Sequence, residues 1–380
     1  MKELIVHIGM HKTGTTSIQS SLNRFDNGKI RYARLSDVNH SIPVYTQFSN
    51  QRHQYHIHTT RGLSPSDIDA KVVEFRRDLD KELTQDRHTL ILSGEDISLL
   101  ESDSVKALKE YLTPHAERIR IVAYVRDPAA FASSALQQYI RGGHGQASIP
   151  SPEYTNRFKA FVDHFGVDSV EFIRFDKDTL RGGSAVQDFC HLVGIDPSEI
   201  NERRGNESTT LECAQMIYHF NRFGLPSTGS PLLTKVRGQF LHRLSNCFTG
   251  SGFKIPQDWV TAHIDTADVA WLQSVSDLQF MGSEQLQNAQ TNRSEDANKD
   301  YIEDLHNMLA TIDRENVQKL KEEVAKIDSH IATSDDVTSL LNFLYTSILL
   351  DTKSKDQSLI SPAVEGAKRA YGRLKPTRAA

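Results

Sequence analysis

The sequence contains little cysteine. Its three cysteines, Cys190, Cys213 and Cys247, are far apart and odd in number, so they indicate neither a disulfide framework nor a zinc site. This usage fits a reducing compartment, and we therefore expect a cytoplasmic protein.

Long hydrophobic runs are also missing. No segment approaches the roughly 20 apolar residues of a transmembrane helix, and the longest candidate, residues 340–350, is interrupted by Asn342, Thr346 and Ser347. The apolar run at the N-terminus leads into a polar loop rather than a small-residue cleavage site, so we interpret it as a strand and not as a signal peptide. These absences predict a soluble protein.

Neither sign of charge dominates the chain. Its 380 residues include 44 Lys and Arg and 49 Asp and Glu, with a net charge of -5, which argues against a general nucleic-acid-binding surface. The 38% of hydrophobic residues are enough for a large core, in one elaborated domain or in two domains.

The most informative stretch is a strand–loop–helix pattern at the N-terminus. Residues 4–8 form an apolar run of strand type, Gly9 and Gly14 permit a tight turn, and residues 17–22 can begin a helix. Such a loop directs backbone N–H groups and the positive end of the helix dipole toward one point, where Lys12 adds an ammonium group. The pattern predicts a phosphate-binding loop.

This loop departs from the P-loop of nucleoside triphosphatases at the lysine. Gly9 and Gly14 have the spacing of G-x-x-x-x-G-K-[ST], but Thr15 stands where that pattern needs lysine, and Lys12 lies two residues before Gly14. The run HKTGTT instead resembles the 5′-phosphosulfate-binding loop of sulfotransferases, which use 3′-phosphoadenosine 5′-phosphosulfate (PAPS) as donor. The resemblance implies that the donor contacts Lys12, Thr13, Gly14, Thr15, Thr16 and Ser17.

Strands and helices alternate in the next part of the chain. Further strand-type runs occupy residues 89–93, 119–125 and 170–175. Amphipathic helical spacing separates them, which predicts an α/β fold with a P-loop-like, mainly parallel sheet flanked by helices. Ligands of such sheets gather beyond the carboxyl ends of the strands, and Lys12, Glu95 and Arg126 each follow a strand.

A second motif combines Arg126 with Ser134. Arg126 leaves a predicted strand at a turn fixed by Pro128, and Ser134 lies on the following helix, so a guanidinium group and a hydroxyl can converge on one phosphate. The pattern resembles the 3′-phosphate-binding element of sulfotransferases. The resemblance extends over about residues 1–215, and RRGNES at 203–208 is similar to the family's nucleotide-closing loop, which implies contacts from Arg203 and Arg204.

What the resemblance implies is sulfuryl transfer from PAPS to a hydroxyl or amine, without a metal. Lys12 would stabilise charge on the leaving phosphate oxygen, and a general base must take the acceptor's proton. Two bases are open: His40, from a region where carbohydrate sulfotransferases supply a catalytic histidine or glutamate, and Glu95 at the end of a strand. We slightly favour His40. The bacterial character of HKTGTTSIQ leads us to expect a carbohydrate acceptor, such as a polysaccharide or glycolipid.

We divide the chain into five parts. The predicted α/β core, its helical elaboration, a linker, a helical C-terminal extension and a flexible basic tail occupy residues 1–215, 216–282, 283–299, 300–352 and 353–380. The tail could contact an anionic acceptor or a membrane surface. The polar stretch 23–65 is treated as a long loop, and the oligomeric state is left open.

Two other functions are compatible with these motifs. One is a P-loop kinase of a small molecule, which is disfavoured because no lysine follows Gly14 and no clear magnesium-holding strand is evident. The other is a nucleotide- or glycan-binding module without turnover, against which the joint presence of Lys12, Arg126 and Ser134 argues.

Overall fold

Five parallel strands form one sheet in the order β2-β3-β1-β4-β5. The computed structural model describes residues 1–203, 208–282 and 301–355. The strands are β1 (Glu3–His7), β2 (Ile30–Tyr32), β3 (Thr89–Ser93), β4 (Arg118–Val125) and β5 (Val170–Arg174). The central strand β1 is buried from Leu4 to His7 because helices cover both faces of a parallel sheet.

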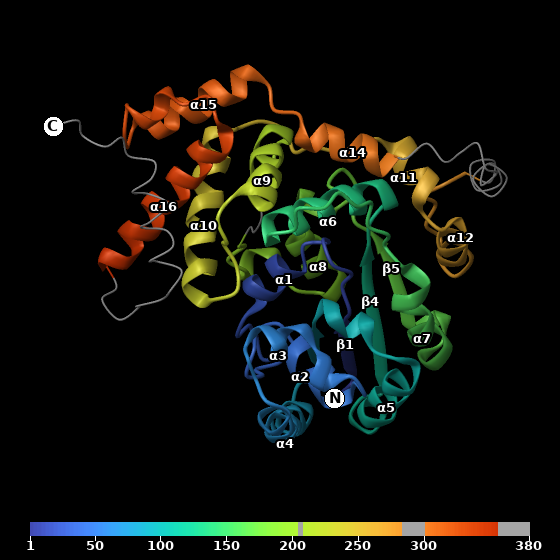
Figure 1. Ribbon diagram of the computed structural model, residues 1–380. Helices are drawn as coiled ribbons and strands as arrows, with labels where there is room; N and C mark the ends of the chain where they lie inside the picture. Colours follow the sequence, from blue (N-terminus) through green and yellow to red (C-terminus); the bar gives the residue numbers. More distant parts are fainter. Residues whose placement is uncertain (204–207, 283–300, 356–380) are drawn as a thin grey trace. The chain divides into compact units, whose positions relative to one another are not determined.

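Helices connect and follow the strands (Figure 1). Those of the first half are α1 (Thr15–Leu22), α2 (Ser41–Phe48), α3 (His56–Thr60), α4 (Pro65–Leu83), α5 (Ser102–Leu112), α6 (Pro128–Gly142), α7 (Tyr154–Phe165) and α8 (Ala185–Val193). Those of the second half are α9 (Leu211–Phe223), α10 (Pro231–Cys247), α11 (Gln257–His263), α12 (Thr266–Ser274), α14 (Tyr301–Ala310), α15 (Arg314–Ala325) and α16 (Val337–Lys355). The predicted α/β fold, with its parallel sheet and helical C-terminal region, is confirmed.

The described residues form two compact units. The first comprises residues 1–131, 151–203 and 264–282, and the second comprises residues 132–150, 208–263 and 301–355. Both units therefore draw on segments that are far apart in the sequence, and they differ from the contiguous parts that the sequence suggested. The predicted linker and nearly all of the predicted tail lie outside the described residues.

Helix α12 shows why the first unit includes a late segment. The carboxylate of Asp268 accepts hydrogen bonds from the N–H groups of Tyr154 (2.8 Å) and Thr155 (2.6 Å). These N–H groups begin α7 and have no intrahelical acceptor, so a distant acidic residue satisfies them.

In the first unit, α1 and α8 pack against one face of the sheet. Ile18 and Leu22 of α1 and Phe189 of α8 share a buried cluster with Ile5 of β1 and Val122 of β4. The apolar positions of the loop-bearing helix thus fix it to the sheet, and the loop before it is held at the carboxyl end of β1.

The stretch 23–65 is not the loop that we expected from its polarity. It contains the edge strand β2 and the helices α2 and α3. Arg31, in the middle of β2, is buried, and its guanidinium group donates to Glu82 at 2.8 Å and to Asp26 at 2.8 Å. Since the chain buries this arginine with two carboxylate partners, hydrophobic periodicity does not reveal the strand.

In the second unit, α16 packs against α10 and α9, α14 packs against α9, and α15 packs against α16. An aromatic cluster joins α9, α10 and α16. The ring centroid of Phe220 on α9 lies 4.6 Å from that of Phe240 on α10 and 5.2 Å from that of Tyr345 on α16. Among the described helices, none combines the length and the apolar character that a membrane crossing needs.

Candidate functional site

The predicted phosphate loop follows β1 and begins as an extension of the sheet. The N–H of Ile8 donates to Val122 O at 2.9 Å, and that of Met10 donates to Tyr124 O at 2.8 Å. The chain then turns through three left-handed residues, Gly9 (φ 87°), Lys12 (φ 68°) and Gly14 (φ 77°). A lysine in this conformation costs roughly 1–3 kcal/mol, and such residues are found mainly at functional sites.

The backbone of this loop presents hydrogen-bond donors. Helix α1 begins at Thr15, and its N-cap residue Gly14 makes no side-chain cap. Across the described part of the chain, the N–H groups of Thr13, Gly14, Thr15 and Thr16 donate to no protein acceptor. Together with the positive end of the helix dipole, these groups form a cradle that suits an anionic oxygen.

The hydroxyls of two loop threonines have a structural task. Thr13 Oγ1 donates to Met10 O at 2.6 Å, and Thr15 Oγ1 lies 3.3 Å from the same carbonyl oxygen. Both side chains are buried. Thr13 and Thr15 therefore brace the turn with their hydroxyls, while their N–H groups face the cradle.

Close packing requires glycine at both ends of the loop. A Cβ atom on Gly9 would lie 2.8 Å from the Cα atom of Glu95, and one on Gly14 would lie 2.8 Å from the Cβ atom of Ala185. The loop is thus pressed between α8 and the segment after β3, which brings Glu95 beside it.

Arg126 reaches the loop from the end of β4. Its Nη1 donates to Lys12 O at 2.9 Å, and its guanidinium carbon lies 5.5 Å from the ring centroid of Phe175. Tyr154 donates its hydroxyl hydrogen to Arg126 O. Burial lowers the pKa of Arg126, but it remains a cation, and no carboxylate in the described ranges lies within ion-pair distance of it. The structure therefore brings Arg126 and Lys12 together across 114 positions of sequence.

Glu95 lies in a short 3-10 helix that follows β3, and the residue is half-buried. Its Oε2 accepts from Gln19 Nε2 at 3.1 Å, and its Oε1 accepts from Asn39 Nδ2 at 3.4 Å. Two neutral amides therefore orient this carboxylate beside the loop and leave it without a cationic partner among these contacts.

His40 does not have the exposure that a general base needs. Its side chain has no exposed surface, its Nδ1 accepts from the N–H of Ser93 at 3.0 Å, and its ring stacks on Tyr32 with centroids 4.5 Å apart. Burial lowers its pKa from 6.5 to about 3. A fully buried imidazole cannot reach the hydroxyl of a bound acceptor, so of the two predicted bases the geometry favours Glu95 and not His40.

A hydrogen-bonded chain beside the loop was missed by the sequence analysis. His11 Nε2 lies 2.7 Å from Asp96 Oδ1, and Arg157 Nη1 lies 3.2 Å from His11 Nδ1. Tyr55 donates its hydroxyl hydrogen to Asp96 Oδ2 at 2.5 Å. The contacts from Asp96 and Arg157 hold the imidazole of His11, the residue before Lys12, through both of its ring nitrogens. The only sequence signals were the His in HKTGTT and the Asp in GED, which give no hint that the two meet.

The other residues that were predicted to bind the donor lie outside the loop itself or outside the described residues. Ser17 lies in the first turn of α1, and its N–H donates to Gly14 O at 2.9 Å. The N–H of Arg203 donates to Ser21 Oγ at 2.8 Å, which places the backbone of Arg203 at α1. Ser134 lies on α6 in the second unit, and Arg204 lies outside the described residues. The 3′-phosphate roles of these two residues stay predictions.

No protein-family model matches the chain, and no curated protein matches it significantly. The functional argument therefore depends on the geometry of the loop and on the residues around it.

Gly94 provides a test of how Glu95 is placed. A Cβ atom at this position would lie 2.2 Å from the N atom of Ser41, so we expect Gly94→Ala to reduce the free energy of unfolding by about 1–3 kcal/mol. Urea unfolding measures this loss. Gly238→Ala is the control, because a Cβ atom there meets nothing within 4 Å in a helix. Equal stability of the Gly94→Ala and wild-type proteins would show that this close approach is absent in solution.

Proposed function

We propose that this protein transfers the sulfuryl group of PAPS to a hydroxyl or amine of an acceptor. The observation that supports it most is the cradle of N–H groups around the left-handed Lys12, with the Arg126 guanidinium hydrogen-bonded to the carbonyl of Lys12. The donor carries a 5′-phosphosulfate and a 3′-phosphate, and the site offers a helix N-terminus and two cations from separate elements.

In the proposed reaction, the acceptor oxygen attacks the donor's sulfur and the bond from sulfur to the bridging phosphate oxygen breaks. The electron pair of that bond moves to the phosphate oxygen, and adenosine 3′,5′-bisphosphate leaves. Lys12 and the loop N–H groups would stabilise this developing charge. Glu95 would take the acceptor's proton, since the residue is only half-buried and Gln19 and Asn39 orient its carboxylate.

Two finer parts of the proposal come from the sequence. The acceptor class, a carbohydrate or glycolipid, rests on the resemblance of HKTGTTSIQ to bacterial sulfotransferases, and the cytoplasmic location rests on the low cysteine content. No residue role in the proposed reaction calls for a metal.

The kinase alternative has less support. No lysine follows Gly14, and the acidic residue that could hold Mg²⁺ after β3, Asp96, is buried and engaged by His11 and Tyr55. A nucleotide-binding module without turnover has the same loop, so only an activity measurement separates it from an enzyme.

Calorimetric titration tests the donor site. We expect adenosine 3′,5′-bisphosphate to bind without metal, and to bind more tightly than ADP, because Arg126 adds a charge-assisted contact to the 3′-phosphate. Arg126→Gln should reduce the ratio of the two affinities roughly ten- to a hundredfold. A general disturbance of the loop would weaken the binding of both nucleotides, so a change in the ratio of their affinities reports the contact to the 3′-phosphate. A wild-type preference for ATP with Mg²⁺ would instead support a kinase.

A further inference from the structure

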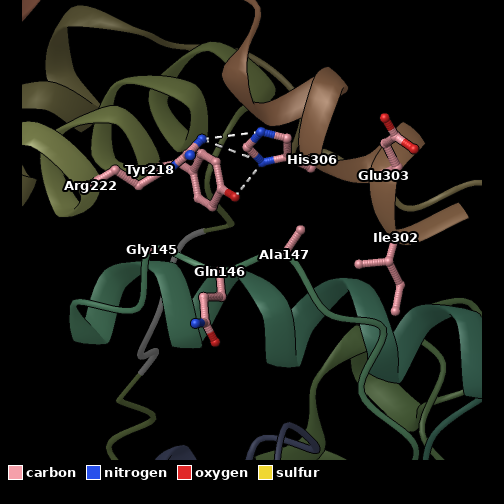
Figure 2. Close-up of a pocket in the computed structure, with 8 residues that line it drawn as sticks. All are labelled: Gly145, Gln146, Ala147, Tyr218, Arg222, Ile302, Glu303 and His306. Carbon is pink, nitrogen blue, oxygen red and sulfur yellow. Dashed lines mark hydrogen bonds between the residues drawn. The ribbon is translucent and has the colours of Figure 1, made fainter. Parts of the chain in front are cut away.

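The second unit contains a recess of about 320 Å³ that no part of the proposed reaction uses. It is lined by the segment after α6, by α9 and by the first turns of α14 (Figure 2). The lining residues are Gly145, Gln146, Ala147, Tyr218, Arg222, Ile302, Glu303 and His306. Its volume lies at the lower end of the roughly 300–1,000 Å³ that small-molecule sites occupy.

Three polar side chains converge at one end of this recess. His306 Nδ1 lies 2.8 Å from the hydroxyl of Tyr218, and Arg222 Nη1 lies 3.2 Å from His306 Nε2. Figure 2 shows Tyr218 and Arg222 reaching from α9 toward the imidazole of His306. Arg222 is exposed and forms no ion pair with a carboxylate within the described ranges. Its guanidinium carbon lies 5.0 Å from the ring centroid of Phe223 and 5.6 Å from that of Tyr218, so among the described residues aromatic rings and an imidazole surround this cation, and a carboxylate does not.

The wall opposite these side chains is held in place by a buried arginine. Arg237 donates to the carbonyl oxygens of Arg141 (2.7 Å) and Ile140 (2.9 Å) at the end of α6. Asn221 of α9 donates to Ile140 O at 2.7 Å and to His144 O at 2.9 Å. These bonds satisfy the last carbonyls of α6 and fix the segment that follows it to α9.

Gly145 lets this wall approach Arg222 closely. A Cβ atom at Gly145 would lie 2.9 Å from Arg222 Cγ and 3.4 Å from the carbonyl carbon of Asn221. The backbone of residues 145–147 and the Arg222 side chain are thus neighbours in a preformed arrangement, which reduces the ordering cost of binding a ligand.

We propose that this recess binds a small sugar acid, that is, a polyhydroxylated ligand with one carboxylate. The planar fork of Arg222 suits a carboxylate. Glu303 and Gln146 also line the recess, and Figure 2 shows both side chains directed away from Arg222. Their oxygens are therefore placed for hydroxyl groups at the far end of a ligand whose carboxylate meets Arg222, and the negative charge of Glu303 opposes a polyanion. Ile302 adds an apolar surface for the C–H face of a sugar ring. The site lies wholly within the second unit, so it neither needs nor supports the proposed sulfuryl transfer.

The test is an NMR titration of the full chain with ¹³C-labelled histidine, using methyl β-D-glucuronide as the probe. The His306 signal is assigned by its loss in His306→Gln. We expect the glucuronide to shift this signal saturably, and methyl β-D-glucoside, which lacks the carboxylate, to bind at least tenfold more weakly. Sodium sulfate distinguishes a general oxyanion site: an affinity equal to that of the glucuronide would overturn the sugar-acid assignment.

Substitutions of Arg222 test whether its guanidinium group binds the carboxylate of the glucuronide. Arg222→Gln should weaken glucuronide binding roughly ten- to a hundredfold, and Arg222→Lys, which keeps the charge but not the planar fork, should weaken it severalfold. Arg314→Gln is the matched control, because Arg314 is an exposed arginine on α15 of the same unit. The histidine spectrum itself verifies that each variant is folded. Unchanged affinity in both Arg222 variants, or no binding to the wild-type protein, would refute the proposal.

Discussion

The Lys12→Ala protein is expected to lose sulfuryl transfer roughly a hundred- to a thousandfold in kcat while it still binds adenosine 3′,5′-bisphosphate. The reason lies in where charge develops. The lysine ammonium would act on the phosphate oxygen as the sulfur–oxygen bond breaks, so its removal raises the barrier more than it weakens ground-state binding. The N–H groups of Thr13 to Thr16 and the Arg126 guanidinium remain to hold the nucleotide.

Single-turnover kinetics beside calorimetric titration measure these two effects separately. Glu95→Gln is the comparison variant: it removes the proposed base at nearly the same size and keeps one acceptor oxygen for Gln19 or Asn39, so turnover should fall while nucleotide affinity stays at the wild-type value. If Lys12→Ala lost binding and rate in equal measure, the lysine would be a binding group only, and the proposed role in bond cleavage would be wrong.

Much of the fold could be predicted because its signals are local. The apolar runs of β1, β3 and the second half of β4 lie between polar turns, β5 keeps three apolar residues among charged ones, and the periodicity of α4 and α16 is plain in the sequence. The sheet could be predicted as parallel because helices separate these runs. The parts that failed depend on partners far along the chain: β2 is short, and its buried Arg31 is stabilised by Glu82, which lies 51 positions away.

The candidate site was predictable in its loop and less so in its surroundings. The glycine spacing and Lys12 sufficed to predict a tight turn between a strand and a helix, and the turn after β4 sufficed to predict Arg126 near it. That the loop binds a phosphate stays a prediction. His40 was favoured as a base because the unperturbed pKa of histidine suits proton transfer, but sequence does not report burial. Neither the His11–Asp96 contact nor the recess at Arg222 could be foreseen, since each joins residues more than 80 positions apart.

Acidification from pH 7 to pH 5 is expected to reduce the free energy of unfolding of the first unit by about 4 kcal/mol. Two buried imidazoles account for most of this loss: those of His7 and His40 have no exposed surface, and burial lowers the pKa of each from 6.5 to about 3. Below pH 6.5 the unfolded chain binds protons at both residues, whereas the folded protein stays neutral there down to about pH 3. The contribution to stability is therefore complete above pH 6.5 and declines as the pH falls, by about 1.4 kcal/mol per pH unit for each histidine.

The unfolding of the first unit can be followed through Trp271, because Trp259→Phe removes the chain's other tryptophan, which lies in the second unit. His40→Asn is the informative variant, since the Asn Oδ1 can replace Nδ1 as acceptor of the Ser93 N–H. This variant should roughly halve the change in the free energy of unfolding between pH 7 and pH 5. The expectation holds whatever the variant does to stability at pH 7, because the change with pH depends on the number of protons taken up on unfolding and not on packing. A free energy of unfolding that stayed constant between pH 7 and pH 5 would contradict the account, for it would mean that both imidazoles take up protons in the folded protein as readily as in the unfolded chain.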